Sequence, residues 1–210
     1  MKKGASLVVE VGIDEPGQMG RHARMIAPDI VVITALEAEH LAGFGDVETA
    51  VREELLMLSE RPGARRVLPL SDPEIRGRRG LLRSGDVGVV EEERLDSGEV
   101  EWPRRGLCWC QRVSSGHASR VTMRVYSEGE RGRPIQTMDL LCPLPGAHNA
   151  RDLGLAVGAA LLLGRSVEEI AGGLSGFEGP LLRSRVVGLA RGALLYEDCF
   201  NAGPASVRRR

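Results

Sequence analysis

Residues 33–49 read ITALEAEHLAGFGDVET, and this stretch decides the predicted fold class. The apolar run at residues 29–34 predicts a buried strand, and a loop with a Gly-Phe-Gly turn then leads to a helix that begins after Asp46. His40 follows this strand, and α/β folds place their ligands at the carboxyl ends of the strands. The stretch therefore predicts an α/β fold with a functional histidine at one edge of its sheet.

The flanking runs extend this prediction to a mostly parallel sheet with flanking helices. Residues 6–11 and 66–70 are apolar and rich in β-branched side chains, as buried parallel strands are. The pattern at residues 18–27 predicts a short amphipathic helix that ends before Pro28, and residues 46–59 predict a second helix. This β-α-β-α-β order implies parallel strands joined by right-handed crossovers.

The second half of the chain has a different pattern. Short strand-like runs separated by Gly, Ser and charged residues predict an antiparallel sub-sheet or meander, with runs at 87–90, 107–113, 120–126 and 135–141. An Ala- and Leu-rich segment predicts a helix at 149–163, and Ser166 is the expected N-cap of another helix at 167–174. Two final strands are expected at 185–189 and 193–196.

Composition excludes several classes of protein. Of the 210 residues 42% are hydrophobic, so a core is expected, and the net charge of −1 gives no general attraction to nucleic acid or membrane. We expect no nucleic-acid partner, no membrane-spanning segment and a cytoplasmic location. The four cysteines lack a second close pair and an adjacent histidine, which favours free thiols over a zinc site.

Four motifs occur in the same order as in the Mur ligase family, which this chain resembles. They are Val-Glu-Val-Gly at 9–12, His-Leu-Ala-Gly-Phe-Gly at 40–45, Leu-Pro-Gly-Ala-His-Asn at 144–149 and Tyr-Glu-Asp-Cys-Phe-Asn-Ala-Gly-Pro-Ala-Ser at 196–206. Within the family, the motifs at 40–45 and 196–206 are most similar to the branch that adds D-alanyl-D-alanine to a UDP-muramyl tripeptide. The resemblance implies an incomplete central ATPase-type domain at residues 1–179 and the start of a C-terminal domain at 180–210.

The resemblance also implies cofactors, partners and site residues. The family uses ATP and Mg²⁺ to convert a carboxylate into an acyl phosphate, which an amine then attacks. Glu10 and His40 correspond to family positions at the metal ion. Asn149 and Asn201 would lie near the nucleotide, although each also has a plain role as a helix cap or a strand end. Arg183 would lie at the junction of the two domains.

Two departures from the family bear on activity. The phosphate-binding loop Gly-x-x-Gly-Lys-Thr-Thr does not occur in the 210 residues. Glu54 occupies the place of the family's carbamoylated lysine, where it either substitutes as a fixed carboxylate or marks a lost site. We therefore expect weak or no catalysis by this chain alone.

Three functional hypotheses stay open after the sequence. In the first, the chain is part of a ligase that a separate polypeptide or a longer gene completes. In the second, it is a pseudo-ligase that binds a nucleotide, a muramyl peptide or a partner protein. In the third, it is a Mur-type ligase for another substrate, such as a polyglutamate-adding enzyme. An unpaired sheet edge would also favour homodimer formation.

Overall fold

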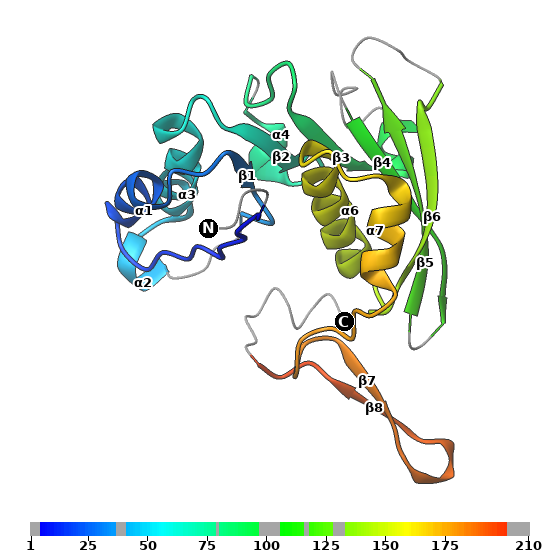
Figure 1. Ribbon diagram of the computed structural model, residues 1–210. Coiled ribbons are helices and arrows are strands. Elements are labelled where there is room, and N and C mark those ends of the chain that lie inside the picture. Colours follow the sequence, from blue (N-terminus) through cyan, green and yellow to red (C-terminus); the bar gives the residue numbers. More distant parts are fainter. Residues whose placement is uncertain are drawn as a thin grey trace. The chain divides into compact units, whose positions relative to one another are not determined.

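The computed structural model describes residues 5–36, 41–78, 80–96, 106–115, 118–127 and 133–200 (Figure 1). The chain divides into two compact units. Unit 1 comprises Met1–Asp29 with Leu36–Ala64, and unit 2 comprises Ile30–Ala35 with Arg65–Arg210. In the described part of the chain, no helix has the length and apolar character needed to cross a membrane.

Unit 1 is helical, with α1 at Gln18–Ile26, α2 at Leu41–Phe44 and α3 at Val47–Glu60. The predicted start of α3 is confirmed, because Asp46 Oδ1 accepts a hydrogen bond from the Thr49 backbone N–H at 2.8 Å. Helix α1 ends at Ala27, in a left-handed conformation just before Pro28, as the sequence predicted. The apolar faces of α1 and α3 bury Met19, Ala23, Ala50, Val51 and Met57.

The predicted strand at residues 6–11 is wrong, because these residues form no strand in the structure. Leu7 is 73% exposed and Val8 is 90% exposed, so the apolar run is not buried either. An apolar, β-branched run becomes a strand only where a neighbouring strand takes its backbone hydrogen bonds. None of the described strands pairs with residues 6–11.

Unit 2 is built on a six-stranded sheet in the order β1-β2-β3-β4-β5-β6. The first three strands are β1 at Ile30–Val32, β2 at Arg65–Pro69 and β3 at Val87–Glu91. The other three are β4 at Gly106–Ser115, β5 at Ala118–Tyr126 and β6 at Gln136–Cys142. Strands β1 to β4 are parallel, whereas β4, β5 and β6 pair antiparallel.

The antiparallel part of the sheet is smaller than the sequence predicted. Strand β3 pairs parallel with both β2 and β4, so the predicted meander begins at β4. The connections on either side of β3 contain the short helices α4 at Pro73–Arg76 and α5 at Glu92–Asp96, which we did not predict. These longer connections let the chain return to the same end of the sheet, whereas only two residues separate β4 from β5.

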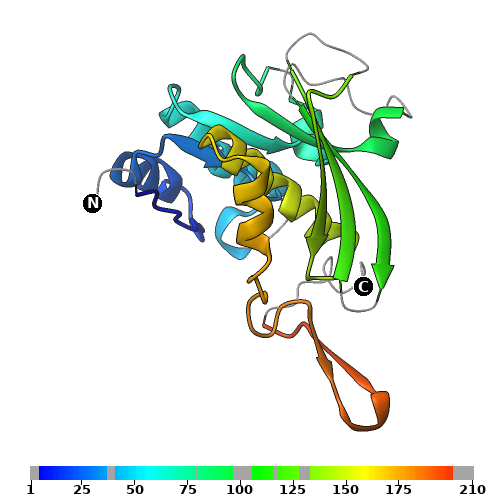
Figure 2. The ribbon, with the colours of Figure 1, turned by 45° about the vertical axis from the view of Figure 1, so that its right-hand side comes forward.

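Helices α6 at Ala147–Leu162 and α7 at Val167–Leu174 lie side by side along the sheet (Figures 1 and 2). Helix α6 approaches the sheet closely at Gly158: a Cβ there would lie 2.9 Å from Val67 Cγ1 and 3.4 Å from Val87 Cγ1. The predicted cap of α7 is confirmed, since Ser166 and Glu169 form a reciprocal capping box. Because a side chain at position 158 would overlap Val67, the core between α6 and the sheet needs a glycine there.

A separate hairpin follows α7. It consists of β7 at Arg185–Gly188 and β8 at Leu194–Glu197, joined through the 3₁₀ turn η1 at Ala190–Gly192. Both strands confirm the sequence prediction. The base of the hairpin is closed because the Leu182 carbonyl accepts hydrogen bonds from the backbone N–H groups of Cys199 at 3.0 Å and Phe200 at 3.2 Å.

We predict that Gly158→Ala destabilises the protein by about 1–2 kcal/mol. The added methyl group would overlap the stiff, β-branched Val67 side chain, and the cost of overpacking exceeds the helix-propensity gain of about 1 kcal/mol. The measurement is the free energy of unfolding from urea denaturation.

Gly172→Ala in α7 is the matched control, because nothing lies within 4 Å of its Cβ position. This variant should be about 1 kcal/mol more stable than the parent. Equal effects of the two substitutions would contradict the close approach at Gly158.

Candidate functional site

The candidate site lies at the first turn of α6, where the chain leaves β6. Gly146 is the N-cap of α6, and its backbone has φ 101° and ψ 150°, a conformation that favours glycine. The His148 imidazole folds back over Gly146, so a Cβ at position 146 would lie 2.8 Å from His148 Cε1. Both constraints favour glycine at position 146, where the missing side chain leaves room for the imidazole.

Two hydrogen bonds join Asn149, His148 and Ser184, and a third ties Asn149 to Pro145. Asn149 Nδ2 donates to the Pro145 carbonyl at 2.6 Å and also lies 3.1 Å from His148 Nε2. His148 Nε2 in turn lies 3.3 Å from Ser184 Oγ. The site therefore links the start of α6 to the segment that precedes β7, although 36 positions separate His148 from Ser184.

The segment around Ser184 has an unusual backbone. Leu182 has φ 62° and Ser184 has φ 49°, left-handed conformations that are costly for residues other than glycine. Ser184 is nevertheless buried, and its hydroxyl contacts His148. Arg183 lies between Leu182 and Ser184 in the sequence. Its guanidinium lies 4.5 Å from the centroid of the Phe200 ring, a cation–π contact. These contacts hold the segment in its strained form.

Two ionisable groups near the site have shifted pKa values. Burial raises the pKa of the Asp152 carboxyl, and the nearby Arg151 and His148 oppose this effect. About half of the Asp152 side chain is exposed, so we expect only a modest rise. Burial also raises the pKa of the Cys142 thiol, which favours the unreactive protonated form.

The structure brings together only some of the predicted site residues. Asn149 and Arg183 both lie in unit 2, where His148 and Ser184 connect their neighbourhoods. Glu10 lies in unit 1, on an exposed segment outside any strand. His40 and Asn201 lie outside the described residues.

The metal site remains a prediction. The described part of the chain contains no group of three His, Cys, Asp or Glu side chains that could hold a metal ion. His40 is not among those residues, so the assignment of Glu10 and His40 as metal ligands stays a prediction.

Glu54 lies half-buried on α3. Its neighbour Glu53 is buried and contacts the start of α1. Glu53 is 8% exposed, and its Oε1 accepts hydrogen bonds from the backbone N–H groups of Gly17 at 2.7 Å and Met19 at 3.2 Å. Gly17, the N-cap of α1, has no side chain to cap the helix, so Glu53 supplies this interaction from α3. The sequence signal that we missed is a glycine at a helix start.

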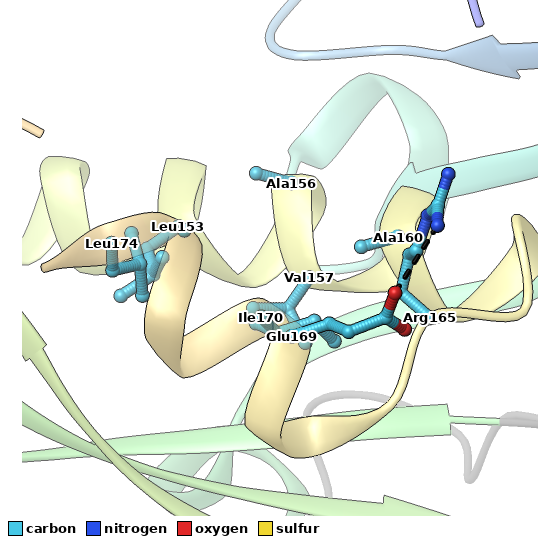
Figure 3. Close-up of a pocket in the computed structure, with 9 residues that line it drawn as sticks. Leu153, Ala156, Val157, Ala160, Arg165, Glu169, Ile170 and Leu174 are labelled. Atoms are coloured by element: carbon cyan, nitrogen blue, oxygen red, sulfur yellow. Dashed lines mark hydrogen bonds and ion pairs between the residues drawn. The ribbon is translucent and has the colours of Figure 1, made fainter. Parts of the chain in front are cut away.

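A shallow apolar groove between α6 and α7 is a separate feature (Figure 3). It has a volume of about 330 Å³, and its only charged lining residues are Arg165 and Glu169, which form an ion pair at 3.2 Å. A nucleotide site needs several convergent polar groups, so this groove is a poor candidate for one.

Comparison with known proteins decides the family. The Mur ligase middle domain matches residues 1–102 of this chain. The UDP-N-acetylmuramate–L-alanine ligase of Mycolicibacterium vanbaalenii is 34% identical over 192 residues, which cover 86% of this chain and 36% of that protein. The chain belongs to the Mur ligase family.

Other Mur ligases agree with this assignment. A UDP-N-acetylmuramoylalanine–D-glutamate ligase of Cereibacter sphaeroides is 28% identical over 182 residues, covering 84% of this chain and 36% of that protein. A crystal structure of MurF from Acinetobacter baumannii has the same fold, with a TM-score of 0.74, 20% identity and coverage of 95% of this chain and 40% of that one. The fold prediction is confirmed, and this Mur ligase chain spans about 36% of the length of the curated relatives that it matches.

We predict that Glu53→Ala lowers the free energy of unfolding by about 2 kcal/mol, because two backbone N–H groups at the start of α1, one of them on buried Met19, lose their charged acceptor. Glu53→Gln keeps a carbonyl acceptor and should cost less than about 1 kcal/mol. Urea denaturation measures both values.

Glu60→Ala is the control for Glu53→Ala. Glu60 lies on the same helix and forms an exposed ion pair with Arg24 at 3.4 Å, so its loss should cost less than about 1 kcal/mol. A loss for Glu60→Ala as large as that for Glu53→Ala would contradict the capping role.

We predict that the free energy of unfolding of Asp152→Asn increases relative to that of the parent as the pH rises. The folded-state pKa of Asp152 lies above the ordinary value of 3.8, so its stabilising contribution is present below that value. The contribution is lost as the pH rises through the raised pKa. Unfolding free energies at pH 3 and pH 6.5 measure the change.

Asp46→Ala should show the opposite pH dependence. Its hydrogen bond from the Thr49 backbone N–H holds the pKa of Asp46 below 3.8, so its contribution is present above that value and is lost as the pH falls. The cost of Asp46→Ala should therefore grow from pH 3 to pH 6.5. The same trend in both variants would contradict the assigned directions.

Proposed function

We propose that this chain provides the central part of an ATP-dependent amide ligase in peptidoglycan precursor synthesis. The observation that carries the proposal is the match of the Mur ligase middle domain to residues 1–102, with named ligases aligned over 84–86% of the chain. Residues 180–210 would begin the C-terminal domain. The arrangement of described residues that fits a nucleotide best is the first turn of α6, with Asn149 as its contact residue.

The proposed reaction follows the chemistry of the family. A substrate carboxylate oxygen attacks the γ-phosphorus of ATP, ADP leaves, and the amine of the second substrate then displaces phosphate from the acyl phosphate. When bound, Mg²⁺ would neutralise charge on the phosphates, with Glu10 and His40 as its proposed ligands. Glu54 is the proposed fixed carboxylate, and Arg183 and Asn201 are proposed to border the nucleotide.

D-alanyl-D-alanine is the proposed second substrate, added to a UDP-muramyl tripeptide. Its support is the pair of motifs at residues 40–45 and 196–206, which are most similar to that branch of the family. The named sequence relatives instead add L-alanine to UDP-N-acetylmuramate or D-glutamate to UDP-N-acetylmuramoylalanine. These two acceptors are therefore the alternatives that an experiment must separate.

A second candidate function is binding without turnover. The absence of Gly-x-x-Gly-Lys-Thr-Thr from the 210 residues favours it, because this loop supplies the backbone N–H groups and the lysine that stabilise the phosphates. A complementing polypeptide that brings such a loop would restore the ligase function.

Calorimetric titration of the 210-residue chain with MgATP tests the nucleotide-binding part of the proposal. We expect one nucleotide to bind per chain, and weak or no phosphate release when UDP-muramyl tripeptide and D-alanyl-D-alanine are added. Absence of MgATP binding would reject the proposed nucleotide site, and clear turnover would reject the expectation of weak catalysis.

Parallel titrations with three acceptors test the branch. Preference for UDP-muramyl tripeptide supports the D-alanyl-D-alanine branch. Preference for UDP-N-acetylmuramate or UDP-N-acetylmuramoylalanine would instead assign the chain to the branch of its named relatives.

A further inference from the structure

We propose that β6 is the interface of a homodimer, in which the β6 strands of two copies of this chain pair antiparallel about a two-fold axis at Met138. The two six-stranded sheets would then form one continuous sheet. The proposal goes beyond the ligase function and does not depend on it, because it concerns an edge of the sheet and involves no nucleotide or muramyl substrate.

Strand β6 forms the longer of the two edges of the sheet. It has seven residues, whereas β1 at the opposite edge has three. Of the described strands, only β5 pairs with β6. The outer side of an edge strand presents N–H and C=O groups that another strand can bind. Because a longer pair of strands makes more hydrogen bonds, β6 is the better edge for pairing with another chain.

The side chains of β6 alternate strictly between the two faces of the sheet. Met138, Leu140 and Cys142 are at most 4% exposed and belong to the core. Thr137 and Asp139, which lie between them in the sequence, are exposed on the opposite face. A second strand beside β6 must therefore continue a buried apolar face on one side and an exposed face on the other.

Two large apolar side chains lie at the ends of the exposed face. Ile135 is 58% exposed and Leu141 is 60% exposed. Ile135 directly precedes β6, and its backbone N–H donates to the Val125 carbonyl at 2.8 Å, so Ile135 extends the pairing with β5. Because they are six positions apart in an extended chain, both side chains lie on the same face. A partner strand that covers both would stabilise the edge.

An antiparallel pair of β6 strands centred on Met138 matches these side chains. Ile135 of each copy lies opposite Leu141 of the other copy, so each exposed apolar side chain gains an apolar neighbour. Thr137 of each copy lies opposite Asp139 of the other copy, and its hydroxyl can donate to the carboxylate. The strand is thus complementary to itself, as the interface of a two-fold symmetric dimer must be.

The Asp139 carboxylate selects this register over its neighbours. A shift of two residues in one direction would set Asp139 opposite itself, and like charges directly opposite one another are destabilising. A shift of two in the other direction would set Asp139 opposite Ile135, and Leu141 opposite Arg133. A shift of one residue would set the exposed face of one copy beside the core face of the other.

Sedimentation equilibrium of the parent chain is the first test. An interface one strand wide buries on the order of 1,000 Å² or less, so we expect a weak dimer with a dissociation constant on the order of 10 µM. Leu141→Lys should weaken the dimer at least about 10-fold, because the two-fold axis makes one substitution act at two contacts.

Leu163→Lys is the matched control for Leu141→Lys. Leu163 is 46% exposed and lies at the C-cap of α6, outside β6, so its replacement should leave the dissociation constant unchanged. Both leucines are exposed, so both variants should fold, which far-UV circular dichroism checks.

Thr137→Lys tests the register by strengthening the dimer. The new ammonium group would lie opposite Asp139 of the second copy, and the dimer should become about 3-fold tighter at low salt. This gain should shrink as the salt concentration rises. A lysine on an edge strand ordinarily opposes pairing, so a tighter dimer would identify Asp139 as the neighbour of position 137.

Disulfide formation tests the register directly. Thr137→Cys and Asp139→Cys are each combined with Cys199→Ser, which removes an exposed native thiol, and are mixed with oxidised glutathione. Positions 137 and 139 would lie directly opposite, with Cα atoms about 4.5–5.5 Å apart, which a disulfide spans. Either variant alone would place its thiols at diagonal positions about 7–8 Å apart. The mixture should therefore form the covalent dimer at least about 10-fold faster than either variant alone.

Three results would overturn the proposal. The first is a parent chain that stays monomeric at about 20 times the expected dissociation constant. The second is a dimer that Leu141→Lys and Leu163→Lys weaken equally, or that neither weakens. The third is an equal rate of disulfide formation in the mixture and in the separate variants. None of these measurements uses a ligand, so their failure is distinct from failure of the proposed ligase function.

Discussion

The close contact between α6 and the parallel strands is the constraint on which the rest of unit 2 depends. At Gly158 the helix lies directly on Val67 and Val87, and a side chain there would have no room. A helix of 16 residues is about 24 Å long, so fixing it near its C-terminal half also fixes where its first turn lies. The position of Asn149 is thus set by packing in the core, nine residues away from the contact itself.

The same helix start is bound to the segment before the hairpin. His148 contacts Ser184, and the Leu182 carbonyl holds the backbone of Cys199 and Phe200. Two of these residues, Leu182 and Ser184, adopt left-handed backbone conformations, which persist only where surrounding contacts fix them. Such strain is frequent at functional sites, and here it coincides with the place where the family resemblance sets the junction of two domains.

Carboxylates in unit 1 show how adjacent residues acquire different roles. The position predicted to matter was Glu54, by its place in the family pattern. The neighbouring Glu53 is the carboxylate turned towards α1, where it accepts two backbone hydrogen bonds at a helix start that lacks a capping side chain. Successive residues of a helix point about 100° apart, so Glu54 cannot face α1 in the way that Glu53 does. One position along α3 therefore changes which contacts a carboxylate makes.

The sequence by itself determined the features that depend on a few neighbouring residues. The caps at Asp46 and Ser166 and the end of α1 before Pro28 were predicted, because the interactions that define them span three or four positions. The strands of the hairpin were predicted too, because their partners lie within 12 positions of each other. The four motifs likewise predicted the family. Only the tertiary structure decided that β3 pairs parallel with β4, that residues 6–11 pair with none of the described strands and that Ser184 contacts His148. Those outcomes depend on which distant segments meet, and the pattern of side chains within one segment does not contain that information.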